Sequence, residues 1–446
     1  MALESINHII REFEIDKPEM RRIMRAFSLE MKAGLEKGGK SSLKMLPTYV
    51  RKPTGEESGI FFALDLGGTN FRILEIELKE KGRAKILKAM NFKLPNRCIT
   101  GDGRELFLYI AGCLKKFLYR YEISNEVCLG FTFSFPIDQT AIDEGRLLNW
   151  TKGFGLKGVI GKDVVQLLKE ALAKRGLGNV EILALLNDTV GTLVARSYKD
   201  PDCRIGIILG TGTNACYSEK LLNIKKLKGR VSKGEDMIIN IEWGNFNKLA
   251  LTRYDRKLDK LSANPGEQIL EKMVSGKYLG EVLRLILNGL VQKKFLFLNL
   301  GSTNLDVPDL FKAEHISDIE NDVSRDLEKT KGTLKSLGIR SSTERDRHII
   351  KRICAAISRR ASRVSASCTA SIIKEMDPNL SKAHTIAVDG TLYEKHPRFS
   401  KNMETAFREI FGKKASRVKM ALTKDGSGIG AAIVAAIVER DKIEKV

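Results

Sequence analysis

Two short glycine-containing segments stand between apolar runs and have the composition of anion-binding turns. The first, residues 65–70, reads DLGGTN, and the second, residues 210–214, reads GTGTN. In such turns glycine lets an anion approach the main chain, and consecutive backbone N–H groups can point at it. Either turn alone could be only a tight hairpin. Their matched composition, with Asp65 in the first, favours a site for the phosphates of a nucleotide.

A possible general base lies in residues 187–189, which read NDT after an apolar run and before a predicted helix. Asn, Asp and Thr are preferred helix N-caps, so capping alone would explain this segment. A carboxylate at the end of a strand also lies where α/β folds bind ligands. There Asp188 could accept the proton of a hydroxyl group.

Further polar residues could bind a ligand with several hydroxyl groups. Such a ligand needs convergent donors and acceptors, because each hydroxyl buried without a partner costs about 1–3 kcal/mol. Singly, each of these residues would be an ordinary surface or turn residue. The candidates are Ser134, Thr151, Lys152, Glu242 and Glu271.

A third glycine cluster, residues 425–431 with the sequence DGSGIGA, opens a predicted helix near the C-terminus. The free N–H groups of a helix N-terminus can hold an anion. Small residues at the start of a helix would equally allow close packing against another helix. The segment by itself leaves both interpretations open.

The elements that must position these residues alternate between strands and helices, which predicts an α/β fold. Residues 60–64 and 71–78 are predicted to form a hairpin around the first turn, and 204–209 with 215–221 a second hairpin. The two Gly-Thr-Asn sequences are 144 residues apart (212 − 68), which predicts two related halves. Other predicted strands cover 127–133, 181–186, 385–388 and 417–422, and predicted helices cover 17–36, 104–119, 164–173, 266–287, 345–376 and 428–439.

Length and composition limit the class of protein. With 446 residues, 43% of them hydrophobic, the chain is long enough for two or three globular domains, and no apolar run approaches the roughly 20 residues of a membrane span. Seven scattered cysteines without a C-x-x-C pair predict reduced thiols and a cytoplasmic location. Because no apolar run is long enough, we expect no membrane span.

The net charge of +21 raises the question of a nucleic-acid partner. Basic residues are spread along the chain among acidic ones, and their short clusters lack interleaved aromatics, which favours a solvated basic surface. No nucleic-acid partner is expected, although an anionic partner stays an alternative. The oligomeric state is left open, and a homodimer is possible.

Read together, these segments resemble the hexokinase family. The order and spacing of the matching motifs are similar from about residue 45 almost to the C-terminus. They are LDLGGTNFR at 64–72, LGFTFSFP at 129–136, LNWTKGF at 148–154, NDT at 187–189, LGTGTNACY at 209–217, EWG at 242–244, NPG at 264–266, EKMVSG at 271–276, VDGTLY at 388–393 and DGSG at 425–428.

The resemblance implies a fold of two α/β domains related to actin and the heat-shock chaperone ATPases, with the ligands in an interdomain cleft. The small domain is expected to comprise residues 59–187 plus 429–446, and the large domain 1–58 plus 188–428. Closure of the cleft around a bound sugar would suppress the loss of ATP to water.

The resemblance also implies an ATP-dependent hexokinase that phosphorylates a hexose, glucose above all, at its 6-hydroxyl with Mg²⁺ and ATP in the first step of glycolysis. Asp188 resembles the general base, and Lys152 and Arg72 resemble electrostatic stabilisers of the transferred phosphoryl group. Asp65 and Asp188 are expected to orient Mg²⁺ through water. The implied sugar-binding residues are Ser134, Thr151, Lys152, Asn187, Asp188, Asn214, Glu242 and Glu271. The implied ATP-binding residues are Asp65, Gly67, Gly68, Thr69, Asn70, Arg72, Gly210, Thr211, Gly212, Thr213, Lys277, Asp389, Gly390, Thr391, Gly426 and Ser427.

Three alternatives stay open. The kinase could act mainly on mannose or fructose, or the chain could be a sugar-binding regulatory protein without catalysis, although Asp188 and Lys152 are both present. An actin-like or chaperone ATPase would share the phosphate-binding turns but should lack the sugar segments at 133–135 and 150–154.

Overall fold

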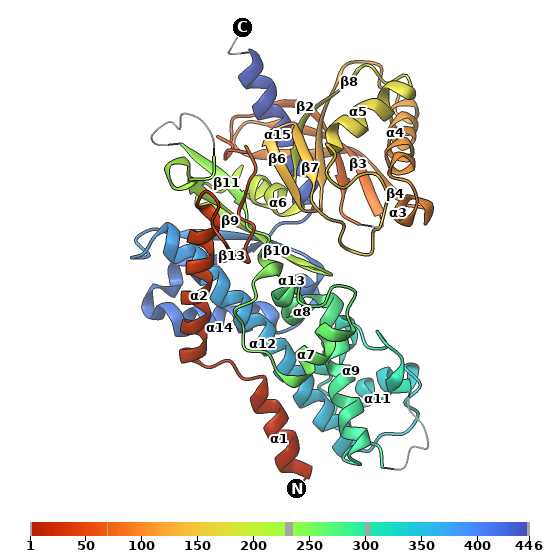
Figure 1. Ribbon diagram of the computed structural model, residues 1–446, viewed down its shortest axis with the longest axis vertical. Helices are drawn as coiled ribbons and strands as arrows, with labels where there is room; N and C mark the ends of the chain where they lie inside the picture. Colours follow the sequence, from red (N-terminus) through yellow and green to blue (C-terminus); the bar gives the residue numbers. More distant parts are fainter. Residues whose placement is uncertain (1, 69, 228–234, 299–303, 444–446) are drawn as a thin grey trace.

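The molecule contains two mixed sheets, one in its upper part and one near its middle in the view of Figure 1. The computed structural model describes residues 2–68, 70–227, 235–298 and 304–443. The first sheet has the order β4-β3-β2-β5-β8, with β2 (Gly59–Leu66), β3 (Asn70–Lys79), β4 (Arg83–Lys93), β5 (Val127–Phe133) and β8 (Val180–Leu186). The second has the order β1-β11-β10-β9-β12-β13, with β1 (Leu46–Pro47), β9 (Cys203–Leu209), β10 (Thr213–Lys220), β11 (Asp236–Asn240), β12 (His384–Asp389) and β13 (Val418–Leu422). A separate antiparallel pair comprises β6 (Ile137–Ala141) and β7 (Glu144–Leu147).

The two sheets repeat the same arrangement, which confirms the predicted related halves. In the first, β2 is antiparallel to β3 and parallel to β5, and in the second β9 is antiparallel to β10 and parallel to β12. Each predicted glycine turn closes a hairpin: Leu66 pairs with Phe71 in one, and Leu209 with Thr213 in the other. Both turns therefore lie at equivalent positions of their sheets.

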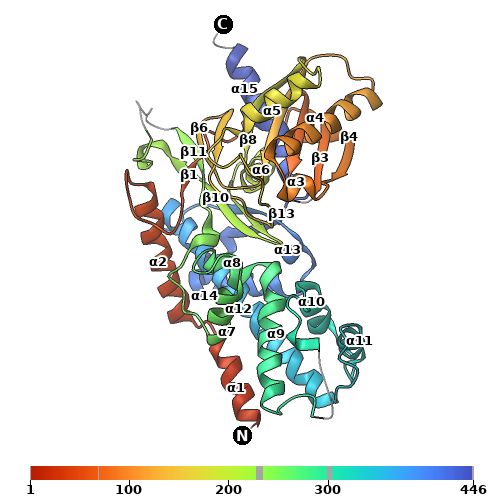
Figure 2. The same ribbon diagram turned by 45° about the vertical axis from the view of Figure 1, so that its right-hand side comes forward.

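Two helices lie side by side between the sheets (Figures 1 and 2). The helix α6 (Asp188–Ser197) packs against β9, and α15 (Gly426–Ile443) packs against β2, β5 and β8. A Cβ atom on Gly430 would lie 2.1 Å from the carbonyl oxygen of Gly191, so the two helix backbones touch at these glycines. The packing interpretation of the third glycine cluster therefore holds for Gly430.

We expect Gly430→Ala to lower the free energy of unfolding by about 1–3 kcal/mol, because the added methyl group meets backbone that cannot move aside. Gly289→Ala is the matched control, since a Cβ atom there has nothing within 4 Å. That control should gain about 0.5–1 kcal/mol from its better helix propensity. Urea unfolding of both variants measures the difference, and equal changes would contradict the close helix contact.

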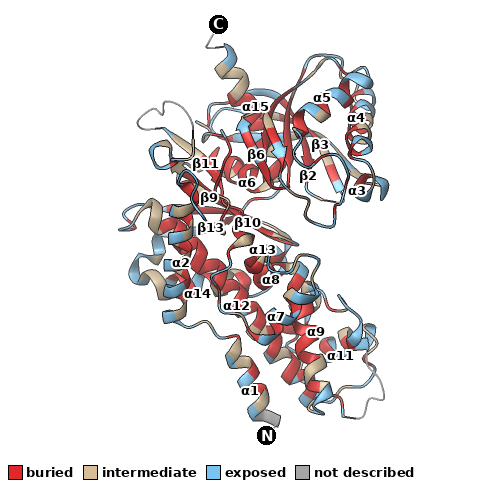
Figure 3. Cartoon of the chain, viewed as in Figure 1, coloured by how far each residue is buried: buried red, intermediate tan, exposed pale blue. Residues whose placement is uncertain are grey.

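The remaining helices cover the outer faces of the sheets or form a helical body below the second one (Figures 1 and 2). Buried residues concentrate where α6 and α15 meet the sheets and along the helices of that body (Figure 3). These elements are α1 (Ala2–Glu12), α2 (Lys17–Leu35), α3 (Arg97–Thr100), α4 (Gly103–Arg120), α5 (Val164–Lys174), η1 (Leu221–Asn223), η2 (Trp243–Asn245), α7 (Arg253–Leu261), α8 (Ile269–Val274), α9 (Gly276–Gln292), η3 (Asn304–Asp306), α10 (Ala313–Asn321), α11 (Glu328–Ser336), α12 (Glu344–Met376), α13 (Thr391–Lys395), α14 (Phe399–Phe411) and η4 (Gly412–Arg417).

Residues 266–287 are mostly helical, as predicted, but they form two helices because the chain is broken at Ser275. Ser275 has extended backbone angles (φ −78°, ψ 152°) and separates α8 from α9. The N–H group of Gly276 donates to the carbonyl oxygen of Gly210 at 2.8 Å. This bond to the second glycine turn replaces the bond that a continuous helix would make within itself.

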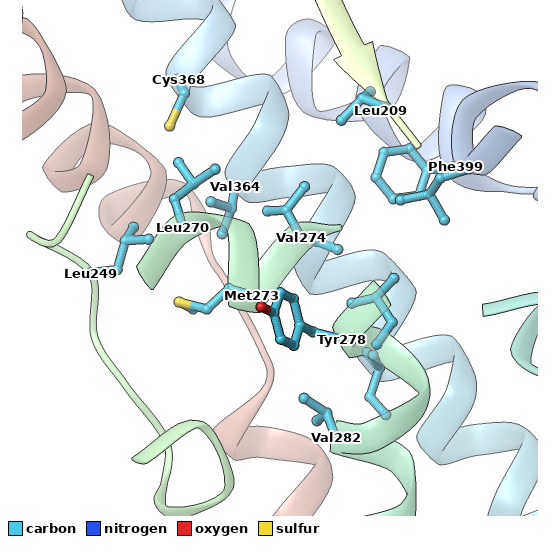
Figure 4. Close-up of a cluster of buried hydrophobic side chains, with 14 of the residues drawn as sticks. Leu209, Leu249, Leu270, Met273, Val274, Tyr278, Val282, Val364, Cys368 and Phe399 are labelled. Atoms are coloured by element: carbon cyan, nitrogen blue, oxygen red, sulfur yellow. The ribbon is translucent and has the colours of Figure 1, made fainter. Parts of the chain in front are cut away.

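The short helix α8 is held by the core beneath it. Leu270, Met273 and Val274 lie among buried apolar side chains that include Val364 and Cys368 of α12 (Figure 4). An isolated helix of six residues would not be stable in water, so this packing keeps α8 in place. The polar residue of this helix that matters for the site, Glu271, is thereby fixed.

The predicted domain boundaries, 59–187 plus 429–446 and 1–58 plus 188–428, stay a prediction. The arrangement of the elements is compatible with them, since α15 packs on the first sheet and β1 pairs with β11 of the second. All seven cysteines are free. No helix within the described residues has the length and apolarity needed to cross a membrane.

Candidate active site

One cleft brings together residues from the ends of strands in both sheets. Ser134 follows β5, Asn187 and Asp188 join β8 to α6, and Asn214 lies in β10. The space in this cleft that is not filled by atoms is about 530 Å³, and this figure includes space open to solvent. All eight predicted sugar-binding residues line it: Ser134, Thr151, Lys152, Asn187, Asp188, Asn214, Glu242 and Glu271.

The candidate base, Asp188, is held at the first position of α6. Asn187 is the N-cap of this helix, and its Oδ1 accepts a hydrogen bond from the N–H of Thr189 at 3.0 Å. Oδ1 of Asp188 accepts from the same N–H at 2.8 Å and from the Thr189 hydroxyl at 3.2 Å. The capping interpretation therefore holds for Asn187, while Oδ2 of Asp188 faces a different partner.

That partner is Lys152, whose Nζ lies 3.5 Å from Oδ2 of Asp188. Nζ also donates to the carbonyl oxygen of Gly67 at 3.0 Å. The backbone of Lys152 is left-handed (φ 56°), which is uncommon for a residue with a side chain and typical of functional turns. Lys152 thus joins the candidate base to the first glycine turn.

Three further cleft residues form a buried amide and carboxylate cluster. Nδ2 of Asn214 lies 3.4 Å from Oδ1 of Asn187 and 3.3 Å from Oε1 of Glu242. Burial raises the pKa of the Glu242 carboxyl to about 7, and the nearby charges of Asp188 and Glu271 act in the same direction. This carboxyl therefore changes its protonation state near neutral pH.

Two cleft residues, Ser134 and Glu271, have buried polar side-chain atoms to which a polar ligand could hydrogen-bond. The Ser134 side chain is only 3% exposed, and its hydroxyl has no hydrogen-bond partner among the described residues. Oε2 of Glu271 accepts from the N–H of Thr213 at 3.2 Å, and burial raises the pKa of Glu271. Because an unpaired buried hydroxyl is costly, Ser134 favours a ligand that supplies a hydrogen bond here.

The first glycine turn carries a charged cluster. Nη2 of Arg72 lies 2.7 Å from Oδ2 of Asp65, and Arg72 also pairs with Asp425. The hydroxyl of Ser427, at the start of α15, donates to the same Oδ2 of Asp65 at 2.7 Å. Gly67, Gly68, Asn70 and Gly426 lie beside these residues in sequence, whereas the predicted ligand Thr69 is outside the described residues.

The second glycine turn gathers the other predicted nucleotide residues. The N–H of Lys277 donates to the carbonyl oxygen of Thr211 at 3.2 Å. A Cβ atom on Gly390 (φ 118°) would lie 2.4 Å from the carbonyl oxygen of Leu209, so only glycine lets these backbones meet. The second group thus comprises Gly210, Thr211, Gly212, Thr213, Lys277, Asp389, Gly390 and Thr391.

The charges that act on Asp389 indicate that the residues around the first glycine turn and those around the second are close to each other. Burial raises the pKa of this carboxyl, with contributions from the charges of Asp188 and Asp425, and the positive charge of Arg72 opposes the shift. Asp389 belongs to the second group, whereas Arg72 and Asp425 belong to the first. A nucleotide could therefore contact both turns at once.

The residues present fit a magnesium ion that arrives with a nucleotide better than a site built by the protein alone. The part of the chain that the structure describes has no cluster of three or more metal-binding side chains. Mg²⁺ commonly keeps several waters and is held by one or two carboxylates together with substrate phosphates. The carboxylates of Asp65 and Asp188 could supply such contacts.

Sequence reasoning missed two polar residues of this region. Gln268 lines the cleft, and Asn240 lies behind it, bonded to both Asn214 and Glu242. Gln268 lies three residues before Glu271, and this spacing could have indicated that both belong to the same site. No sequence signal marks Asn240, because a single asparagine at the end of a strand is common.

The comparisons with known proteins agree with this geometry. Two family profiles, both described as hexokinase, match residues 5–198 and 204–437. The chain is 41% identical to Hexokinase-2 of Oryza sativa subsp. japonica over 94% of this chain and 87% of that one, and 40% identical to Hexokinase-1 of Arabidopsis thaliana over 96% and 90%. A solved hexokinase from Schistosoma mansoni complexed with glucose has a TM-score of 0.90 at 36% identity, covering 98% of this chain and 99% of that one.

The fold and the cleft define a two-domain α/β sugar kinase, which confirms the predicted fold class. Both halves of the sequence match the same family, and the identity to its members extends over nearly the whole chain. The chain belongs to the hexokinase family. Its enzyme class is therefore ATP-dependent hexose kinase.

Proposed function

We propose that this chain transfers the terminal phosphoryl group of Mg-ATP to the 6-hydroxyl of a hexose, with glucose as the preferred substrate. The observation that carries the proposal is the Asp188–Lys152 pair. It lies between the buried amide and carboxylate cluster of the cleft and the first glycine turn. The related Schistosoma mansoni hexokinase is complexed with glucose, which supports this choice of sugar. The products are hexose 6-phosphate and ADP.

Asp188 is the proposed general base. Its Oδ1 is fixed by two hydrogen bonds from Thr189, so Oδ2 keeps a defined orientation in the cleft. A hexose bound by the surrounding amides and carboxylates would place its 6-hydroxyl next to this oxygen. Asp188 then takes the hydroxyl proton as the oxygen attacks phosphorus.

Lys152 and Arg72 are the proposed electrostatic stabilisers. Phosphoryl transfer depends mostly on alignment and on neutralising charge that spreads over the phosphoryl oxygens. Lys152 reaches both Asp188 and the first turn, and Arg72 lies in the strand that follows this turn. The proposed ATP contacts are the two glycine turns, Lys277, and the segments around Asp389 and Ser427.

Magnesium would be held by the ATP phosphates and oriented by Asp65 and Asp188 through water. When bound, the ion neutralises negative charge on the phosphates. We further propose that the cleft closes around the sugar before transfer, and that the enzyme works in the cytoplasm at the first step of glycolysis.

A coupled assay for ADP release tests this function. Wild-type protein with Mg-ATP and glucose should release ADP only when the sugar is present. Comparing kcat/KM for glucose, mannose and fructose then decides the preferred hexose. Sugar binding without sugar-dependent ADP release would instead support a non-catalytic sugar-binding protein.

The pH dependence of sugar use should reflect Glu242. Its carboxylate is proposed to accept a hydrogen bond from the sugar, and its pKa is raised to about 7. As pH falls through about 7 the carboxyl becomes protonated, so kcat/KM for glucose should decrease roughly tenfold per pH unit below that point. Glu242→Gln should lower kcat/KM and remove this limb of the pH profile. A limb that stays near pH 7 in the variant would assign it to another group.

A further inference from the structure

A buried asparagine behind the cleft connects two of its lining residues. Asn240 is the last residue of β11 and is 3% exposed. Its Oδ1 accepts a hydrogen bond from Nδ2 of Asn214 at 2.8 Å, and its Nδ2 donates to Oε1 of Glu242 at 2.9 Å. Asn240 does not line the cleft, but both of its polar side-chain atoms are bonded to residues that do.

The bond to Asn240 fixes which way the Asn214 amide faces. Nδ2 of Asn214 carries two hydrogens and has three acceptors: Asn240 at 2.8 Å, Glu242 at 3.3 Å and Asn187 at 3.4 Å. The shortest bond uses one hydrogen. The second hydrogen is shared between the two longer contacts, to Glu242 and Asn187. The amide could therefore donate this hydrogen to a ligand oxygen at little cost. A flipped amide would place two carbonyl oxygens against each other.

The bond from Asn240 also fixes the Glu242 carboxylate. Glu242 has left-handed backbone angles (φ 54°, ψ 51°), which bring its side chain back toward the end of β11. Within the described residues, the hydrogen bonds that other side chains donate to Glu242 go to Oε1. Oε2 is therefore left for a ligand hydroxyl.

The same bond opposes protonation of Glu242. Burial raises the pKa of this carboxyl, and the charges of Asp188 and Glu271 raise it further. The hydrogen bond from Asn240 acts in the other direction because it favours the charged form, as does the more distant Lys44. Without this bond, more of the carboxyl would be protonated at neutral pH.

We propose that Asn240 is a positioning residue for the sugar, which holds the Asn214 amide and the Glu242 carboxylate in the orientations that bind hexose hydroxyls. This inference rests on the proposed function. Asn240 acts through its two neighbours and contacts no reacting atom.

Three variants test this role. Asn240→Ala removes both hydrogen bonds and should raise the KM for glucose about tenfold or more, with the KM for ATP within about twofold of wild type. Asn240→Asp has nearly the same shape and keeps the acceptor for Asn214, but it places a second carboxylate beside Glu242. It should move the acid limb of kcat/KM for glucose to higher pH than in wild type.

Ser218→Ala is the matched control. Ser218 is buried in the same pair of strands, and its hydroxyl donates to Oδ2 of Asp236 at 3.2 Å, away from the cleft. This variant loses a partly buried hydrogen bond of the sheet and should keep the KM for glucose. An equal rise in KM in the control would overturn the proposal, because general loosening of the sheet would then explain it.

Unchanged KM and pH profile in both Asn240 variants would also overturn the proposal. If Asn240→Ala does not fold, the same-shaped Asn240→Asp carries the test. A wild-type protein without hexose-dependent ADP release would refute the proposed function and leave Asn240 testable by sugar binding. The two tryptophans of the sequence, Trp150 and Trp243, are adjacent to cleft residues, so their fluorescence can report that binding.

Discussion

Replacing Asp188 by asparagine should lower kcat for sugar-dependent ADP release by about two to four orders of magnitude. Asparagine keeps the shape of the side chain and an oxygen for the N–H of Thr189, but it cannot accept the hydroxyl proton. The α6 N-terminus should therefore stay folded, because its cap is provided by Asn187. Glucose binding should change by less than about tenfold.

The measurement combines the coupled assay with a fluorescence titration of glucose. A variant that binds glucose but turns over at the wild-type rate would exclude Asp188 as the base. A loss of binding equal to the loss of rate would indicate that Asp188 holds the sugar and does not act in proton transfer. Asp188→Ala provides a second variant, in which the contacts from Thr189 are also lost.

Replacing Lys152 by methionine should lower kcat by about two to three orders of magnitude, since one preorganised charge near the transferred group is removed. Methionine keeps most of the length of the side chain and its apolar stem. The bond to the carbonyl oxygen of Gly67 and the contact with Asp188 are both lost. The KM for ATP should rise less than kcat falls, because the proposed effect is on the transition state.

Lys162→Met is the matched control for this variant. Lys162 is an exposed lysine in the segment after the Lys152 turn and does not line the cleft. Its replacement should leave kcat and KM within about twofold of wild type. Equal losses in both variants would assign the effect to overall surface charge, and Lys152→Arg should recover part of the rate if a positive charge at this place is what matters.

Much of the fold could be predicted because the glycine turns and the apolar strands beside them are local signals. The hairpins around residues 65–70 and 210–214 form as expected, and their spacing of 144 residues (212 − 68) corresponds to two sheets in which a hairpin has the same parallel neighbour arrangement. Residues 266–287 have a helical pattern that is continuous in sequence, but the structure divides them between α8 and α9. The break at Ser275 depends on the bond between Gly276 and Gly210, and no local pattern reveals a contact between segments so far apart.

In the candidate site, too, some features could be predicted from the sequence and others depend on the tertiary structure. The types and order of its chemical groups are a property of the sequence, since Asp188, Lys152 and the two glycine turns belong to motifs that are recognisable along the chain. The roles of these residues stay predictions until the variants are measured. Their assembly into one cleft depends on the packing of α6 against α15 and of α8 against α12.

The sequence by itself determined the class of chemistry and the secondary structure near each motif, because both depend on residue types and short-range spacing. Only the tertiary structure decided which side chains meet. Asn240 shows the difference most clearly: it lies two residues before Glu242 and matches no motif itself, yet in the fold its side chain bonds both to Glu242 and to Asn214 of β10. The physical reason is that hydrogen bonds and burial depend on distances in space, which folding sets through the packing of all segments together.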